Sequence, residues 1–176
     1  MATNIATLTK VNISYALKFL VLLSIATAGP LVGIHSQWIT GPIVNATLIL
    51  AVYLVGARGA LLIGILPSTI ALSSGLLPAV LAPMIPFIII GNSLLILVVD
   101  WFKNNSNYWL GLLCGASAKY FLLALTSGVV IHLIAKQALA LTVSQMMSWP
   151  QFVTAVLGGV LALGVMKIMK VEYGKN

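Results

Sequence analysis

The sequence predicts an all-α fold: a polytopic membrane protein in which a single domain, residues 1–176, forms a bundle of six transmembrane helices. The first observation is composition, since 61% of the residues are hydrophobic, 6% are charged and the mean hydropathy is +1.13. A soluble domain carries charge on about a quarter of its residues, and a disordered chain has the opposite balance. At about 20 apolar residues per span, six helices take roughly 120 residues and leave only short loops.

The second observation is a set of long apolar runs separated by Pro, Gly and polar clusters. We place the six spans at 14–34, 42–56, 59–75, 84–102, 109–134 and 150–171. Residues 56–59, Gly-Ala-Arg-Gly, are typical of a tight hairpin between the second and third spans. Three prolines interrupt the apolar segment 73–86, so we expect an irregular, partly buried connection there.

The third observation is the placement of the basic residues, which resist translocation and so mark cytoplasmic loops. With the amino terminus inside, the residues on the inner side are Lys10, Arg58, Lys103, Lys167, Lys170 and Lys175. Lys136 lies outside, and Lys18 and Lys119 lie within spans. We therefore expect both termini in the cytoplasm and no nucleic-acid partner for the net charge of +7. In an alternative interpretation, the first span is a cleavable signal peptide ending at Ala28, which leaves five spans.

The sequence contains little material for enzyme chemistry. Its two acids, Asp100 and Glu172, fall near the predicted inner surface, so paired-carboxylate catalysis and two-metal sites are not expected. Motifs for nucleotide phosphates, zinc proteases and serine hydrolases are missing. His35 and His132 are isolated in sequence, and a metal shared between them is a less favoured interpretation than two solvated histidines. We expect no catalytic residue, no metal and no cofactor.

Lys119 is the most informative residue, because an ionisable group inside the bilayer is costly and is a functional-site candidate by default. It lies about ten residues into the fifth span, near the membrane midplane at 1.5 Å per residue. In the functional interpretation it is a cation that meets an anionic group on a bound solute. In the structural alternative it bonds to neighbouring helices or reaches the inner surface along its flexible stem.

Other polar groups suggest a cavity around this lysine. Asn45 and Asn92 place amides inside the second and fourth spans, although interhelical hydrogen bonding is the alternative. Segment 35–42 mixes donors, acceptors and an indole beside a turn, as a lid or cavity rim does, or as an interfacial tryptophan anchor does. Hydroxyls of the third and fifth spans are suited to lining the same cavity. The candidate substrate-binding residues are Lys119, Asn45, Asn92, Gln37, Trp38, Ser68 and Thr126.

Small residues four positions apart recur along the chain and allow helix backbones to approach closely. Two such pairs lie in the first span, Ser24 with Ala28 and Gly29 with Gly33. Most of these pairs serve internal packing, and one or two are candidates for a docking face for another membrane protein.

Several local stretches resemble a known family: QWITGPIVN at 37–45, GARGA at 56–60, GILPS at 64–68, PMIP at 83–86 and Gly-Asn at 91–92. Together with chain length, six short spans and scarcity of acids, they resemble the substrate-binding S components of energy-coupling factor (ECF) vitamin transporters. Several of these components have a polar stretch opening the second span, a glycine-flanked basic turn and a third helix with a Gly-x-x-Pro-like pattern.

The resemblance implies a protein of the inner membrane of a prokaryote that binds a vitamin-like solute from outside. The cavity would lie among the outer halves of helices four to six, capped by the first and third loops. The partners would be the solute, membrane lipid, a membrane coupling subunit and two cytoplasmic ATPases, which would explain the missing ATP site.

The family's docking motif, Ala-x-x-x-Ala in the first helix, is not present as such. The candidate docking residues are Ser24, Ala28, Gly29 and Gly33. Three other functions stay open: a non-transporting membrane scaffold subunit, a small membrane enzyme acting on lipid or prenyl substrates, and a stand-alone secondary transporter. The last usually carries an internal repeat, and none is evident here.

Overall fold

The computed structural model describes residues 2–31, 36–75, 77, 79–105, 107–133 and 137–173. Within these ranges the secondary structure is helical, without strands. In chain order the elements are α1 Ala2–Leu31, α2 Gln37–Leu54, α3 Gly56–Ser73, the 3-10 helix η1 Ala79–Met84, α4 Ile85–Asn105, α5 Tyr108–Leu133, α6 Gln137–Met146 and α7 Trp149–Ile168.

The predicted all-α polytopic bundle is confirmed. Five helical segments are long and apolar enough to cross a membrane: Gln37–Leu54, Gly56–Ser73, Leu81–Lys103, Tyr108–His132 and Val143–Ile168. The apolar part of α1, Ile13–Gly29, is shorter and packs against α2 and α3. The outer face of α5 presents Phe121, Leu125 and Val129, each 60% exposed or more, at the i, i+4, i+8 spacing of a helix face that contacts lipid.

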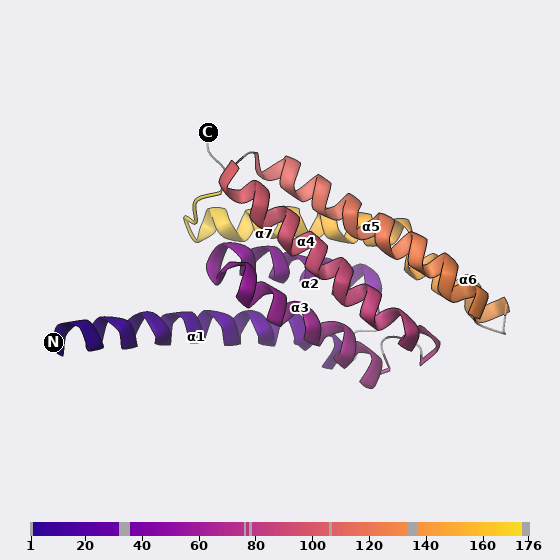
Figure 1. Cartoon of the computed structure of the whole chain (residues 1–176), viewed down its shortest axis with the longest axis horizontal. Helices are drawn as coiled ribbons and strands as arrows, with labels where there is room; N and C mark the ends of the chain where they lie inside the picture. Colours follow the sequence, from indigo (N-terminus) through magenta and orange to yellow (C-terminus); the bar gives the residue numbers. More distant parts are fainter. Residues whose placement is uncertain are drawn as a thin grey trace.

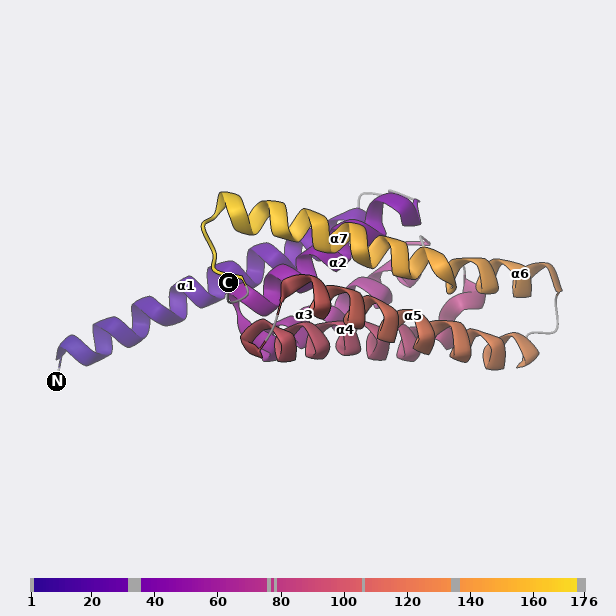
Figure 2. The same ribbon diagram turned by 90° about the horizontal axis from the view of Figure 1, so that it is seen from above.

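The start of α1 and the end of α7 lie at the same end of the bundle (Figures 1 and 2). This is the arrangement expected when α1 and the five longer segments all cross the membrane. The α2–α3 and α4–α5 turns lie at this end too. Four of the basic residues assigned to the inner side therefore fall together, at the start of α3 and at the ends of α4 and α7: Arg58, Lys103, Lys167 and Lys170. Lys136 and Lys175 lie outside the described residues.

The turns at the two ends of α3 each contain a glycine with a positive φ. Gly56 has φ +79° and Gly75 has φ +77°, a backbone conformation that residues with a side chain rarely adopt. Gly56 follows Val55 directly, so the α2–α3 hairpin is tighter than expected and α3 begins at 56 rather than 59. In its described residues, the connection after Gly75 is irregular and partly buried, as expected, and Leu81 and Met84 of η1 are fully buried.

Other boundaries also differ from the sequence prediction. α2 begins at Gln37 rather than at 42 and contains Pro42. α1 begins at Ala2 rather than at 14, because the polar residues before the apolar run continue the same helix. The last span is α7, and it follows a separate helix, α6, which the sequence analysis did not predict. α6 is stabilised by packing, since Val143 of α6 and Met147, the residue directly after it, join a buried cluster with residues of η1 and α5.

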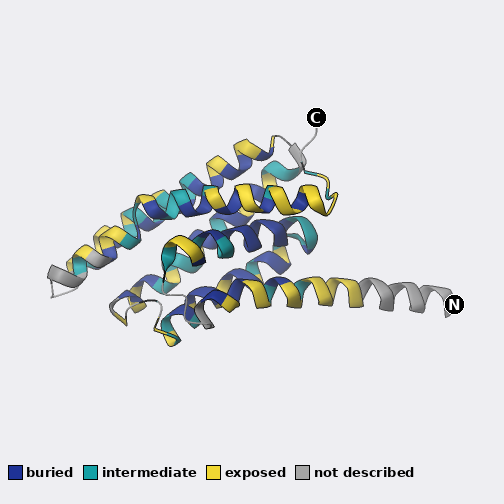
Figure 3. Cartoon of the chain, turned by 180° about the vertical axis from the view of Figure 1, so that it is seen from behind, coloured by how far each residue is buried: buried dark blue, intermediate teal, exposed yellow. Residues whose placement is uncertain are grey.

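The larger core surrounds α2, whose residues from Asn45 to Val52 are all buried (Figure 3). Its closest approach is to α7, where Gly158 faces the α2 backbone. A Cβ at Gly158 would lie 2.6 Å from Asn45 Cβ and 2.8 Å from the Ala46 nitrogen. The absence of a side chain at 158 therefore allows α2 and α7 to pack backbone to backbone, and this contact positions Asn45.

Candidate functional site

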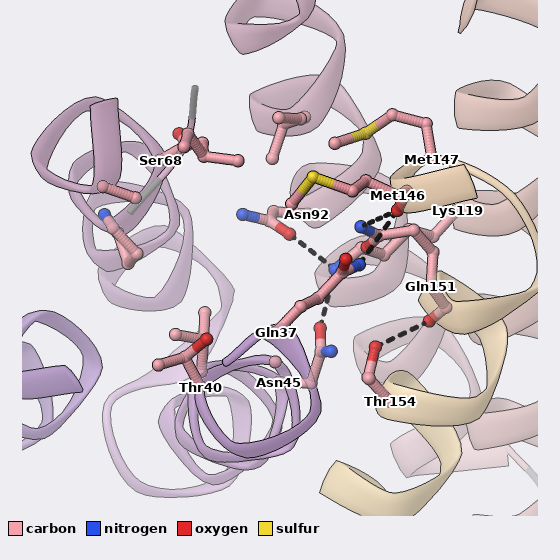
Figure 4. Close-up of a pocket in the computed structure, with 16 residues that line it drawn as sticks. Gln37, Thr40, Asn45, Ser68, Asn92, Lys119, Met146, Met147, Gln151 and Thr154 are labelled. Carbon is pink, nitrogen blue, oxygen red and sulfur yellow. Dashed lines mark hydrogen bonds between the residues drawn. The ribbon is translucent and has the colours of Figure 1, made fainter. Parts of the chain in front are cut away.

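Lys119 is enclosed near the centre of the bundle, on the twelfth residue of α5 and about 17 Å along its axis at 1.5 Å per residue. The side chain is 3% exposed. Its Nζ donates hydrogen bonds to Asn45 Oδ1 at 2.7 Å and to Asn92 Oδ1 at 2.8 Å (Figure 4). The ammonium group thus joins α2, α4 and α5 at one point.

Glycines create the space for this arrangement. A Cβ at Gly91 would lie 3.3 Å from Lys119 Cγ, so the lysine stem passes directly beside the α4 backbone. Gly64 packs against α4, and its carbonyl accepts a hydrogen bond from Asn92 Nδ2 at 3.2 Å. Because a carbonyl only accepts, this bond fixes the Asn92 amide with its oxygen toward Lys119.

No carboxylate lies beside the lysine. The sequence has two acids. Asp100 follows Asn92 by eight residues of α4, about 12 Å along the helix axis, and Glu172 follows the end of α7. The buried cation is therefore held by amide dipoles, with no opposite charge next to it. Its third N–H makes no hydrogen bond within the part of the chain that the structure describes.

A cavity of about 120 Å³ opens beside Lys119. Five of the seven predicted binding residues line it: Gln37, Asn45, Ser68, Asn92 and Lys119. The other two do not. Trp38 is 48% exposed and its ring lies 5.3 Å from that of Trp149, whereas the Thr126 hydroxyl donates to Leu122 O of its own helix.

The sequence analysis missed the contribution of the α6–α7 junction. Gln37 Nε2 donates to Met146 O at 2.9 Å and Gln151 Nε2 donates to the same oxygen at 3.0 Å. We call these two bonds, with the Trp38–Trp149 ring contact, the clasp, since they tie the start of α2 to the start of α7. Gln151 and Thr154 are polar residues about one turn apart in the last span, so they lie on one face of that helix. This spacing could have indicated from the sequence that α7 lines the cavity.

The cavity also lies differently from the expectation that the family resemblance gave. It is lined by α2 and α3 as well as by α4, α5, the end of α6 and the start of α7. α2 contributes Gln37, Thr40 and Asn45 because its polar residues recur on one face. A cavity confined to helices four to six would not include these side chains.

The candidate docking residues do not share one surface. Ser24 and Ala28 are exposed on the outside of α1. Gly29 is buried, and a Cβ there would lie 3.0 Å from Thr40 Cγ2, so Gly29 serves the packing of α1 on α2. Gly33 and His35 lie outside the described residues. The described residues contain no group of three His, Cys, Asp or Glu side chains that could hold a metal ion.

Comparison with protein-family models, with curated proteins and with solved structures finds no match for this chain. The function is therefore argued from the geometry of the Lys119 site.

Proposed function

We propose that this protein is the solute-binding membrane subunit, or S component, of an ECF-type importer for a vitamin-like, anionic small molecule. It would lie in the cytoplasmic membrane of a prokaryote with both termini inside, and separate ATPase subunits would energise import. The observation that carries the proposal is a buried lysine beside a cavity, hydrogen-bonded to two asparagines and without a carboxylate partner.

An uncompensated buried charge is expensive, and its cost falls when an opposite charge binds. An anion in the cavity would therefore offset the desolvation free energy that burying Lys119 costs the folded protein. The two amide oxygens orient the ammonium before the anion arrives, so little ordering cost remains for the binding step.

The size of the cavity predicts that binding requires movement. Sites for drug-sized ligands usually enclose about 300–1,000 Å³, well above the present volume. A vitamin-sized solute therefore enters only when the clasp opens. Its bonds join short segments at the ends of α2, α6 and α7, so they can part while the core around α2 stays packed.

The test is native mass spectrometry of the protein gently purified from its own membranes. We expect a retained small anion and copurifying coupling and ATPase subunits. Lys119→Met keeps the length of the side chain and removes the charge, and it should lower anion affinity at least about ten-fold, since hydrogen bonds to charged groups contribute about 1.5–3 kcal/mol. Lys18→Met is the matched control, because Lys18 is an exposed lysine of α1.

A scaffold subunit predicts a different result. In that case the lysine only joins helices, so Lys119→Met lowers thermal stability and the wild type carries no small molecule. An unchanged adduct in a folded Lys119→Met protein would remove the ligand role of Lys119. A clean mass for the wild type, with no adduct and no partner subunits, would argue against the importer itself.

A further inference from the structure

The hydroxyl groups around the cavity use their hydrogens on their own helices. Thr40 Oγ1 donates to Ser36 O at 2.9 Å, and Ser68 Oγ donates to Ile65 O at 3.3 Å. Thr154 Oγ1 donates to Gln151 O at 3.2 Å. A hydroxyl has one hydrogen and two lone pairs, so each of these oxygens is left as an acceptor for a molecule in the cavity.

The two glutamines of the clasp each keep an acceptor oxygen and one of their two N–H groups. Both Nε2 groups donate to Met146 O, and a backbone carbonyl can only accept. These bonds therefore fix both amide orientations. The Oε1 atoms of Gln37 and Gln151 accept no hydrogen bond within the described residues, so the glutamines also offer acceptors.

Donors gather at the opposite end of the cavity. Lys119 Nζ has one N–H left, and Asn45 turns its Oδ1 to the lysine and so presents its Nδ2 group. Among the described residues every fully enclosed side-chain nitrogen or oxygen has a hydrogen-bond partner. Asn45 Nδ2 makes no such bond, so it faces open space, and the cavity that Asn45 lines provides it.

The two ends are separated along α2. Gln37 is the first residue of this helix and Asn45 lies eight residues further, about 12 Å along the axis. Gln151 lies near the start of α7, on the side of Gln37. The cavity thus has a positively charged donor end near the membrane midplane and an uncharged end at the clasp. At the clasp the oxygens of Gln37, Gln151, Thr40 and Thr154 outnumber the two remaining glutamine N–H groups.

We propose that the solute is a monocarboxylate that carries a neutral N–H or O–H donor at its opposite end. The carboxylate accepts from Lys119 and Asn45, and the donor group is bound by the oxygens of Gln37 and Gln151. One lysine balances one negative charge, so a doubly charged phosphate would leave a buried charge unpaired. An ammonium at the clasp would lack a carboxylate there, which makes a neutral donor the better match. This proposal rests on the proposed solute-binding function.

The test uses matched probes in titrations of the full-length protein in lipid nanodiscs, read by native mass spectrometry. The amide acids are succinamate, glutaramate, adipamate and suberamate, each compared with the monomethyl ester and the diamide of the same parent diacid. The ester keeps the carboxylate and loses the distal donor, whereas the diamide keeps the donor and loses the charge. At the best chain length we expect the amide acid to bind at least about ten-fold more tightly than either analogue.

Variants test the Lys119 end and the clasp end of the cavity separately. Gln151→Met should abolish the preference for amide over ester while carboxylate binding remains, and Gln37→Met makes the same test from α2. Gln145→Met is the control, because Gln145 is exposed. Lys119→Met should weaken amide acid and ester alike.

The outcomes distinguish a failure of the proposed solute chemistry from a failure of the proposed solute-binding function. Equal binding of amide acid and ester would overturn the donor requirement and leave an anion-binding subunit. Tighter binding of inorganic phosphate than of any monocarboxylate would overturn the monocarboxylate assignment. Failure of every carboxylate at every chain length, together with a wild type free of any natural adduct, would overturn the solute-binding function as well.

Discussion

Gly158 of α7 offers a way to perturb the Lys119 site without touching it. In Gly158→Ala the added methyl would lie 2.6 Å from Asn45 Cβ, 2.8 Å from the Ala46 nitrogen and 2.9 Å from Pro42 O. Two of these neighbours are backbone atoms, which cannot rotate away as a side chain does. The helices must therefore separate locally to accept the methyl group.

The magnitude follows from the distances. Ordinary contact begins at 3.4 Å, so α2 must shift by about 0.8 Å relative to α7. Overpacking of this kind costs about 1–3 kcal/mol, and each kcal/mol lowers the melting temperature of a chain of this size by about 2–4 °C. The Lys119–Asn45 bond is 2.7 Å long, and a shift of the same size exceeds the tolerance of a good hydrogen bond.

We therefore expect Gly158→Ala to melt about 2–12 °C below the wild type and to bind the anion about ten-fold more weakly. The matched control is Gly164→Ala, six residues further along α7, where a Cβ meets nothing within 4 Å. Both variants raise helix propensity equally, so their difference isolates the contact with α2. The assay is thermal unfolding in nanodiscs with and without the retained solute. Equal melting temperatures and equal affinities for the two variants would refute the reasoning.

Three further changes test the charge, the packing and the docking surface. Asn45→Asp places a carboxylate against Lys119 Nζ, so we expect anion binding to be lost while melting stays at or above the wild-type temperature; retained binding would contradict the counter-charge argument. Tyr108→Phe removes the 2.6 Å hydrogen bond to Gly159 O and should cost about 1 kcal/mol in thermal stability without changing solute affinity. Ala28→Trp should prevent copurification of the coupling subunit and leave solute binding unchanged. The control Leu125→Trp, on the exposed face of α5, should leave both copurification and solute binding unchanged. Intact complexes with Ala28→Trp would show that α1 is not part of the docking face.

The membrane bundle was predictable because the bilayer imposes a strong constraint on composition: each crossing needs a long apolar run, and the runs are visible in the sequence. Helix ends were less predictable. The polar segment before residue 14 continues α1, since hydropathy reports what crosses lipid and does not report where a helix begins. The sequence did not predict α6, because a short helix has little stability of its own. It is stabilised by tertiary contacts, in which Val143 and the following residue Met147 pack against η1.

The candidate site was predictable for those polar residues whose burial inside a membrane span costs free energy. A lysine and two asparagines inside spans are expensive unless they have partners, and the structure brings Lys119, Asn45 and Asn92 together. Trp38 was named as part of a polar rim segment and Thr126 as a hydroxyl of the fifth span, and neither side chain lines the cavity. An interfacial indole can contact another indole, and a hydroxyl can bond to its own helix, as both do here.

The part of the site that the sequence conceals is the direction of its hydrogen bonds. Gln37 and Gln151 are both able to donate and accept, so composition assigns no polarity to them. The orientation of both amides is set by Met146 O, a backbone atom that is placed by the break between α6 and α7. The polarity of the cavity therefore depends on where one helix stops, and a change that made α6 and α7 continuous would remove the clasp end while leaving Lys119 and its asparagines intact.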